Sequence, residues 1–221
     1  MDAIPAIGRF NSDAPKFGPQ VLFWLGLCTR AHLPERHFRQ VAKMVHQPSQ
    51  LQAIHLLLGI LEKGGIGVMI GPSGVGKTQM AVALAVRHII DSKAAPRRSA
   101  ADGPRYATAA EMFRELRSAF GTGAHQSEAS MLARFTRPPL LIIDEVHEIK
   151  SSDYELRRLT EIIDVRYRKM VPTILISNLG RAELSQQLGP SVISRIFECG
   201  QLVDFTNCPS HRGEQVAAYV V

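Results

Sequence analysis

Cysteine is scarce in this sequence, and its placement argues against two kinds of scaffold. The 221 residues include three cysteines, Cys28, Cys199 and Cys208, which lie far apart and form no C-x-x-C pair. An odd and scattered set of this kind fits neither a zinc ribbon nor a disulfide framework. We expect free thiols in a reducing compartment.

Long apolar runs are also missing. The apolar stretch at Val21–Leu27 is far too short to cross a bilayer. The first residues do not lead from a basic region into an apolar segment, as a secretory signal would. We therefore expect a soluble, cytoplasmic protein with no membrane partner.

Acidic and aromatic residues are both in short supply. Lysine and arginine number 26 against 20 aspartates and glutamates, which gives a net charge of +6. A basic balance suits an acidic partner, nucleic acid first. Aromatic residues make up 6% of the chain and do not interleave with the basic clusters, so no base-stacking platform is evident. The basic clusters fit either sequence-independent phosphate contacts or an ordinary solvated surface.

What the sequence does contain is a complete phosphate loop, GPSGVGKT at residues 71–78. A short apolar run, Ile66–Ile70, precedes it, and a segment of helical composition, Gln79–Ile90, follows it. The glycines let backbone N–H groups curl around phosphates, and the helix N-terminus adds its dipole. The residues predicted to bind the nucleotide are Gly71, Pro72, Ser73, Gly74, Val75, Gly76, Lys77, Thr78 and Gln79.

Two side chains of the loop have predicted roles of their own. Lys77 would place its ammonium against the β- and γ-phosphates, and the Thr78 hydroxyl would bind Mg²⁺. The expected cofactors are therefore ATP or ADP together with Mg²⁺.

Two adjacent acids supply the chemistry that a phosphate loop needs. Asp144 and Glu145 close the apolar run Leu140–Ile143. Asp144 would hold Mg²⁺ directly or through water, and Glu145 would polarise the water that attacks the γ-phosphate. A second acid beside the metal ligand favours water over a substrate hydroxyl, so the pattern indicates an ATPase rather than a kinase. We interpret the nearby His147 as a loop histidine.

Two further residues are candidate catalytic groups. Asn178 follows the apolar run Thr173–Ile176 and could orient the water, touch the γ-phosphate, or simply cap a turn. Arg195 stands between apolar residues in a short helical segment, where it could reach a neighbour's γ-phosphate or be a surface arginine. The competing arginines are Arg157, Arg166 and Arg181.

Apolar runs alternate with helical segments, which predicts a parallel sheet covered on both faces. Capping boxes at Ser49, Thr108 and Ser152 mark three helix starts. The predicted strands are 66–70, 105–107, 140–143, 173–176 and 202–205. The predicted helices include 49–62, 79–90, 112–120, 126–135, 183–188 and 191–197.

Together these motifs resemble the AAA+ branch of phosphate-loop ATPases, and within it the DnaC/IstB group of helicase loaders and transposition helpers. The linker at 31–38 is also similar to that group. The segments that carry the resemblance are GPSGVGKT (71–78), RYATAAEMFRELRSAF (105–120), LLIIDEVHE (140–148), RYRKMVPTILISNL (166–179) and ELSQQLGPSVISRIFECGQLVDF (183–205).

The resemblance implies a fold and roles. The fold is an α/β phosphate-loop NTPase of the additional-strand type, a five-stranded parallel sheet of order 5-1-4-3-2 flanked by helices, without a separate lid domain. Asn178 is then the sensor-1 residue and Arg195 the arginine finger. The expected organisation is an N-terminal arm and linker at 1–48, an ATPase core at 49–206 and a tail at 207–221.

The implied function is a DnaC-like ATPase that loads a hexameric replicative helicase onto single-stranded DNA. The alternative is an IstB-like helper that delivers target DNA to a transposase, and the core motifs do not separate the two. Either protein would assemble into a ring or spiral on binding ATP, and oligomerisation and DNA would activate hydrolysis. Phe23 and Trp24 fit a docking patch for the partner as well as they fit the core.

Overall fold

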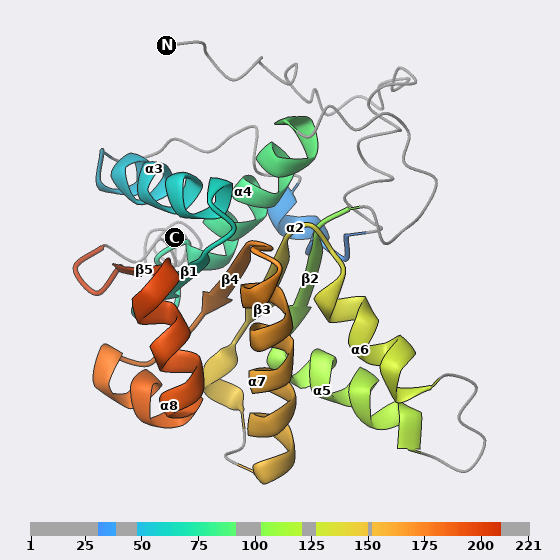
Figure 1. Ribbon diagram of the computed structural model, residues 1–221. Coiled ribbons are helices and arrows are strands. Elements are labelled where there is room, and N and C mark those ends of the chain that lie inside the picture. Colours follow the sequence, from blue (N-terminus) through green and yellow to red (C-terminus); the bar gives the residue numbers. More distant parts are fainter. Residues whose placement is uncertain (1–30, 39–47, 92–102, 121–126, 150–151, 209–221) are drawn as a thin grey trace, which may run out of the picture.

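The computed structural model describes residues 31–38, 48–91, 103–120, 127–149 and 152–208. Within them, a five-stranded sheet carries helices on both faces (Figure 1). The strands are β1 (Ile66–Ile70), β2 (Arg105–Thr108), β3 (Leu141–Asp144), β4 (Thr173–Ile176) and β5 (Gly200–Asp204). The helices are α2 (Glu35–Phe38), α3 (Pro48–Glu62), α4 (Lys77–Asp91), α5 (Ala109–Arg117), α6 (Glu128–Thr136), α7 (Asp153–Arg168) and α8 (Arg181–Cys199), with short 3₁₀ turns η3 (Ser118–Phe120) and η4 (Val146–Glu148).

The sheet has the predicted topology. All pairings are parallel and the strand order is β2-β3-β4-β1-β5, which is the predicted 5-1-4-3-2 read from the other edge. Strand β4 therefore lies between β1, which leads into the phosphate loop, and β3, which ends in the two acids. Because the strands are parallel, their carboxyl ends meet at one edge, where α/β proteins bind ligands.

Two apolar layers hold the helices to the sheet. On one face, α3 and α4 pack with the inward side chains of the strands and with Ala31 and Leu33 of the linker. On the other face, α5, α6, α7 and α8 pack over the opposite side chains (Figure 1). Each strand residue of β1, β3 and β4 is buried, as expected for strands covered on both sides.

Side-chain caps begin several of the helices. The Thr108 hydroxyl accepts the Glu111 N–H at 3.2 Å and the Glu111 carboxylate accepts the Thr108 N–H at 2.9 Å, so the predicted capping box is complete. Only half of the predicted box forms at Ser152. Its hydroxyl accepts the Glu155 N–H, but the Glu155 carboxylate instead pairs with Arg117.

Most element boundaries differ from the prediction by a few residues, and three of the differences have a clear local cause. Helix α3 begins at Pro48, one residue before the predicted cap Ser49, at a position where the fixed φ of proline favours a helix start. The two predicted helices between 183 and 197 form one helix, α8, interrupted at Gly189. Strand β5 begins at Gly200 rather than 202 because Gly200 and Gln201 pair with β1, although neither is an apolar strand residue.

Arg166 is a structural residue, which removes it as a candidate arginine finger. Its side chain is 1% exposed and lies at the end of α7. The guanidinium donates to the Phe135, Pro138 and Pro172 carbonyls and to the Thr173 hydroxyl, at 2.6–3.1 Å. Burial lowers its pKa to about 9, so it stays charged at neutral pH and joins α6, α7 and β4.

Three further expectations from the sequence concern metal ligands, cysteines and membrane-spanning segments. In the described part of the chain, no three His, Cys, Asp or Glu side chains cluster as metal ligands would. Cys199 and Cys208 are free thiols, whereas Cys28, Phe23 and Trp24 lie outside the described residues. None of the described helices combines the length and the apolar character needed to cross a bilayer.

Candidate nucleotide site

The phosphate loop joins β1 to α4 with a backbone that glycine permits. Gly71, Gly74 and Gly76 have φ values of 130°, 87° and 92°. A Cβ on Gly71 would also lie 2.9 Å from the backbone carbon of Phe205, which follows β5. Other residues would be strained at these positions, so the glycines are required for the turn that exposes the loop N–H groups.

Lys77 begins α4, and oxygen atoms surround its ammonium. The Nζ atom donates to the carbonyl oxygens of Gly71 at 2.6 Å and Pro72 at 2.8 Å, and to Asn178 Oδ1 at 2.9 Å. Lys77 is 5% exposed. The same cation thus closes the loop and ties it to Asn178, just after the end of β4.

Thr78 and Asp144 meet across the edge of the sheet. The Thr78 hydroxyl donates to Asp144 Oδ2 at 2.7 Å, although the two residues are 66 positions apart. Asp144 Oδ1 accepts the Glu145 N–H at 2.7 Å. A hydroxyl oxygen beside a carboxylate is the hard donor set that Mg²⁺ prefers, so these residues fit the predicted metal.

Tyr106 is a third group on the same carboxylate. Its hydroxyl donates to Asp144 Oδ2 at 2.8 Å, from strand β2. The sequence analysis did not find it, because a tyrosine in a predicted strand is most often a core residue. The only available signal was its place in the strand next to the acids.

Glu145 stands directly after β3 in the left-handed region, with φ 56° and ψ 38°. This conformation is uncommon for a residue other than glycine and is often found at functional sites. Partial burial, followed by the charges of Glu148 and Asp144, raises the pKa of Glu145. A carboxylate with a raised pKa is a stronger base, which suits it to accept a proton from water.

His147 and Asn178 form a contact that the sequence analysis missed. The Asn178 N–H lies 3.3 Å from Nδ1 of His147, and the Asn178 amide nitrogen lies 3.2 Å from Nε2. A neutral imidazole accepts at one nitrogen only, so one of the two contacts is a hydrogen bond at a time. His147, predicted as a loop histidine, thus supports the residue that touches Lys77.

The side chain of Gln79 contacts the linker. The side-chain nitrogen donates to the His37 carbonyl at 2.8 Å, and the side-chain oxygen lies 2.6 Å from His37 Nδ1. The side chain therefore fastens α4 to α2 of the linker. The backbone N–H of Gln79, in the first turn of α4, has no partner within the helix and remains suited to an anion.

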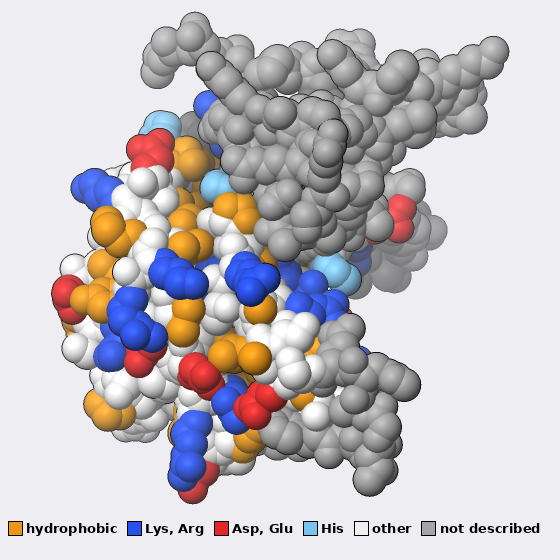
Figure 2. All heavy atoms as spheres, turned by 45° about the vertical axis from the view of Figure 1, so that its right-hand side comes forward, with side chains coloured by type: hydrophobic (Ala, Val, Ile, Leu, Met, Phe, Trp, Pro, Cys, Tyr) orange, Lys and Arg blue, Asp and Glu red, His pale blue; other side chains and the backbone are white. Residues whose placement is uncertain are grey.

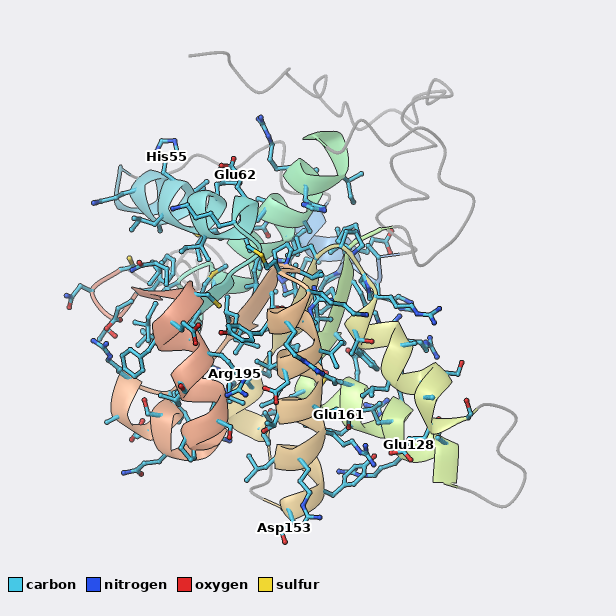
Figure 3. The ribbon with its side chains drawn as sticks, in the orientation of Figure 1. His55, Glu62, Glu128, Asp153, Glu161 and Arg195 are labelled. Atoms are coloured by element: carbon cyan, nitrogen blue, oxygen red, sulfur yellow. The ribbon has the colours of Figure 1, made fainter. Side chains whose placement is uncertain are left out.

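Arg195 is the predicted catalytic residue that the fold does not bring to this cluster. Its guanidinium pairs with Asp164, lies 5.8 Å from the centre of the Tyr167 ring and donates to the Ser191 carbonyl at 2.8 Å. Figure 3 shows it between α8 and α7. Any action on a γ-phosphate by Arg195 would therefore have to occur at another subunit's loop.

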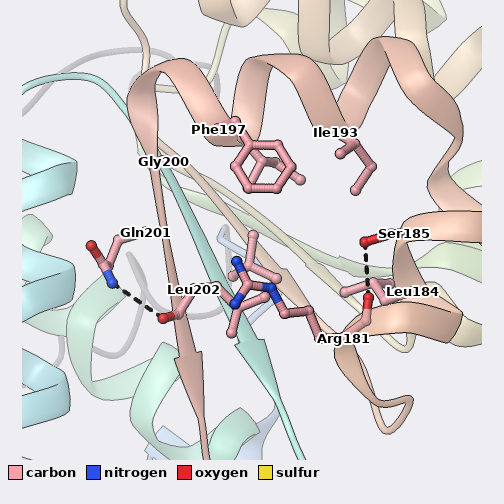
Figure 4. A pocket seen from close by; sticks show the side chains of 10 residues that line it. Arg181, Leu184, Ser185, Ile193, Phe197, Gly200, Gln201 and Leu202 are labelled. Atoms are coloured by element: carbon pink, nitrogen blue, oxygen red, sulfur yellow. Dashed lines mark hydrogen bonds between the residues drawn. The ribbon is translucent and has the colours of Figure 1, made fainter.

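The other arginines proposed for that role occupy different surroundings. Arg157 is exposed and lies 3.8 Å from Asp153 on the same helix. Arg181 lines a groove of about 240 Å³ between α8 and β5, together with Phe197, which is 71% exposed (Figure 4). Among the residues that the structure describes, neither arginine is hydrogen-bonded or ion-paired with the nucleotide cluster.

Comparison with known proteins shows which family and which solved structures this chain is similar to. A family model described as IstB-like ATP binding protein matches residues 30–198. A structure of the DnaC helicase loader is 23% identical with a TM-score of 0.62, covering 77% of this chain and 99% of that one. A structure of DnaI is 19% identical with a TM-score of 0.56, covering 73% and 87%.

AMPPCP-bound DnaA from Aquifex aeolicus is also similar, at 17% identity and a TM-score of 0.61. The match covers 84% of this chain but 55% of DnaA, so the chain spans about half of that relative. At these identities the structures show a shared AAA+ fold and nothing more. Comparison with curated protein sequences gives no match.

Proposed function

The chain belongs to the family of IstB-like ATP-binding proteins, and from this premise we propose that it hydrolyses ATP and loads a hexameric replicative helicase onto single-stranded DNA. One observation carries the ATPase part of the proposal. Hydrogen bonds join Lys77 to Asn178 and join Asp144 to both Thr78 and the backbone of Glu145, so residues from three strand ends meet at one edge of the sheet. A nucleotide-binding module without turnover would have no need of a base such as Glu145 in it.

The positions of these side chains support the catalytic roles that we propose for them. The loop N–H groups and Lys77 bind the β- and γ-phosphates and neutralise their charge. Glu145 accepts a proton from the attacking water, and Asn178 orients that water or the γ-phosphate. Thr78 and Asp144 would hold Mg²⁺, which supplies charge stabilisation at the phosphate oxygens when it is bound.

Self-association completes the proposed site. Arg195 contacts α7 of its own chain, so it would serve as the arginine finger only for the nucleotide of a neighbouring subunit. A head-to-tail interface that repeats in this way builds a ring or a spiral. Hydrolysis would then depend on assembly, and DNA that promotes assembly would activate it.

Single-stranded DNA is the proposed partner of the assembled protein. Figure 2 shows lysine and arginine side chains interspersed with acidic and apolar ones on one face. In the described part of the chain, some basic residues are paired with carboxylates, as Arg134 is with Glu115 and Arg158 with Glu128. Partial neutralisation of this kind suits weak, sequence-independent contacts that become strong when many subunits repeat them.

We rank helicase loading first among the candidate functions because of the similarity to the DnaC helicase loader. The match to the DnaC helicase loader covers 99% of that chain and 77% of this one, so almost all of that loader structure has a counterpart here. The domain division at 1–48, 49–206 and 207–221 remains part of the proposal, and residues 1–48 are where we would look for the surface that grips the helicase. Delivery of target DNA to a transposase is the second candidate, which the IstB-like family model favours.

Affinity capture with a Glu145→Gln variant tests the proposal. Removing the base should hold the protein in its ATP-bound assembly and preserve the contact with its partner. The wild type in the presence of ADP is the matched control. Recovery of a hexameric replicative helicase from the native host would support the loader, and recovery of a transposase would select the second candidate. Recovery of neither, with only the protein and DNA, would contradict both.

A further inference from the structure

We propose that Tyr106 is a positioning residue for the carboxylate of Asp144, holding it in the orientation that binds Mg²⁺. The proposal rests on the proposed ATPase function and names a residue outside the phosphate loop and the pair of acids. It starts from one contact, the 2.8 Å hydrogen bond from the Tyr106 hydroxyl to Asp144 Oδ2.

The fold fixes the ring of Tyr106 in place. In the register of β2 with β3, Tyr106 pairs with Ile142, two residues before Asp144 and on the same face of the sheet. The ring is 8% exposed and packs in the apolar layer beneath α4. The backbone N–H of Tyr106 donates to the Ala31 carbonyl at 2.8 Å, so the linker also holds the strand.

The hydroxyl of Tyr106 completes the set of donors around Asp144. Oδ1 accepts the Glu145 N–H, and Oδ2 accepts both the Thr78 and the Tyr106 hydroxyls. Three donors from three segments prevent the carboxylate from rotating. Because Thr78 donates its proton to this fixed acceptor, the lone pairs of the Thr78 oxygen remain available to a cation.

The hydroxyl is a donor at every physiological pH. Burial, followed by the neighbouring charge of Asp144, raises the pKa of Tyr106 far above its ordinary value. Asp144 is itself 4% exposed and accepts this hydrogen bond inside the fold. Phenylalanine would keep the packing of the ring and remove only the hydrogen bond.

The test is a Mg²⁺ titration of nucleotide binding with Tyr106→Phe. A fluorescent ATP analogue reports binding, first in EDTA and then with increasing Mg²⁺. We expect the affinity in EDTA to stay within about twofold of wild type and the Mg²⁺ concentration at half-effect to rise roughly tenfold or more, as losses of outer hydrogen bonds at metal sites do. Tyr167→Phe, on α7 and away from the site, is the matched control and should change neither value.

Three outcomes would overturn the proposal. An unchanged Mg²⁺ midpoint would show that the hydroxyl does not position the metal ligand. An equal loss of affinity in EDTA and in Mg²⁺ would show that Tyr106 supports the loop itself. Failure of the wild type to bind the analogue at all would remove the proposed ATPase function, and this result is distinct from the first two.

A double substitution tests whether Tyr106 acts through Asp144. Asp144→Asn should weaken the Mg²⁺ dependence by itself, and adding Tyr106→Phe should then change it by less than about twofold, because coupled residues are not additive. A full additional loss in the double variant would contradict the proposed route through Asp144.

A measurement on the wild type covers the case in which Tyr106→Phe does not fold. The chain has four tyrosines, so labelling them with ¹³C at Cζ gives four signals. Substituting Tyr154, Tyr167 and Tyr219 singly by phenylalanine assigns the signal of Tyr106 by elimination. Adding Mg²⁺ to the nucleotide-bound protein should shift that signal, and no shift would overturn the proposal.

Discussion

At the scale of single residues, the charged side chains of this protein are of two kinds. Some are buried and satisfied by several hydrogen-bond partners, and others lie where their charge lowers the stability of the fold. Lys77 and Arg166 are buried cations whose donors are met by carbonyl, amide or hydroxyl oxygens. Glu145 is different, because partial burial and then the like charges of Glu148 and Asp144 raise its pKa. A base under such repulsion is suited to take a proton from water, and it should destabilise the folded protein.

Glu145→Gln should therefore make the protein more stable while removing ATP hydrolysis. A raised folded-state pKa means that the ionised carboxylate opposes folding at neutral pH, and that the effect vanishes below the unfolded pKa of about 4.3. We expect the melting temperature to rise by roughly 1–3 °C at pH 7, the scale of a partly exposed charge pair, and to match wild type near pH 4. Glu62→Gln, at an exposed position on α3, is the control. A lower melting temperature at pH 7 would contradict the expected sign.

Arg166 provides the second residue-scale prediction. Arg166→Met fills similar space but leaves the Phe135, Pro138 and Pro172 carbonyls without their donor. We expect a loss of about 3 kcal/mol or more in the free energy of unfolding by urea. Arg168→Met, exposed on the same helix, should change the free energy by less than about 0.5 kcal/mol. Equal effects of the two substitutions would show that burial of the Arg166 network contributes nothing.

At the scale of elements, α8 shows how a local backbone requirement shapes a helix. Gly189 has φ 77° and ψ 164°, and Pro190 follows it, so the helix turns between its first and second halves. The second half carries Arg195 and returns the chain to β5 at Gly200. The Glu183 carboxylate accepts the Gly180 N–H at 3.2 Å and fixes the start of the first half.

Two glycine substitutions separate the backbone requirement from packing. A Cβ at Gly189 or at Gly59 of α3 would meet no atom within 4 Å, so packing is the same at both positions. Gly189→Ala forces a left-handed φ and should cost about 1–2 kcal/mol, whereas Gly59→Ala should stabilise by about 0.5–1 kcal/mol. Urea unfolding of both variants measures the difference. A shared sign would show that the kink at Gly189 is not a backbone requirement.

At the scale of the whole molecule, one member of the proposed nucleotide site, the proposed arginine finger Arg195, lies away from the others. The phosphate loop, the acids and Asn178 come from one chain, while Arg195 is engaged with Asp164 and Tyr167 on α7. The proposed head-to-tail assembly would supply Arg195 from the next subunit, which requires it to leave this pairing. Activity would then be a property of the assembly.

Mixing two inactive variants tests whether the site is shared. Lys77→Ala should not bind ATP, and Arg195→Ala should bind ATP but hydrolyse it poorly. In an equal mixture, about a quarter of head-to-tail contacts would join an intact loop to an intact finger and restore that share of activity. Arg157→Ala, which removes an exposed side chain, is the control and should be active without mixing. No recovery on mixing would rule out a finger supplied by a neighbouring subunit.

The sequence by itself determined the parts of this protein that depend on near neighbours in the chain. The glycine pattern with Lys77 and Thr78, the apolar strands and the cap at Thr108 are local requirements of backbone and solvation, so residue order suffices to predict them. The strand order came from the family resemblance and was confirmed.

Only the tertiary structure decided the contacts between distant strands. Tyr106 meets Asp144 because parallel register places them on one face of adjacent strands, and the sequence does not state the register. The burial of Arg166 and the contact of His147 with Asn178 were likewise hidden, since both depend on which segments pack together. Side chains separated by tens of residues become neighbours through the packing of the sheet. The order of residues along the chain does not give the distances between such side chains in space.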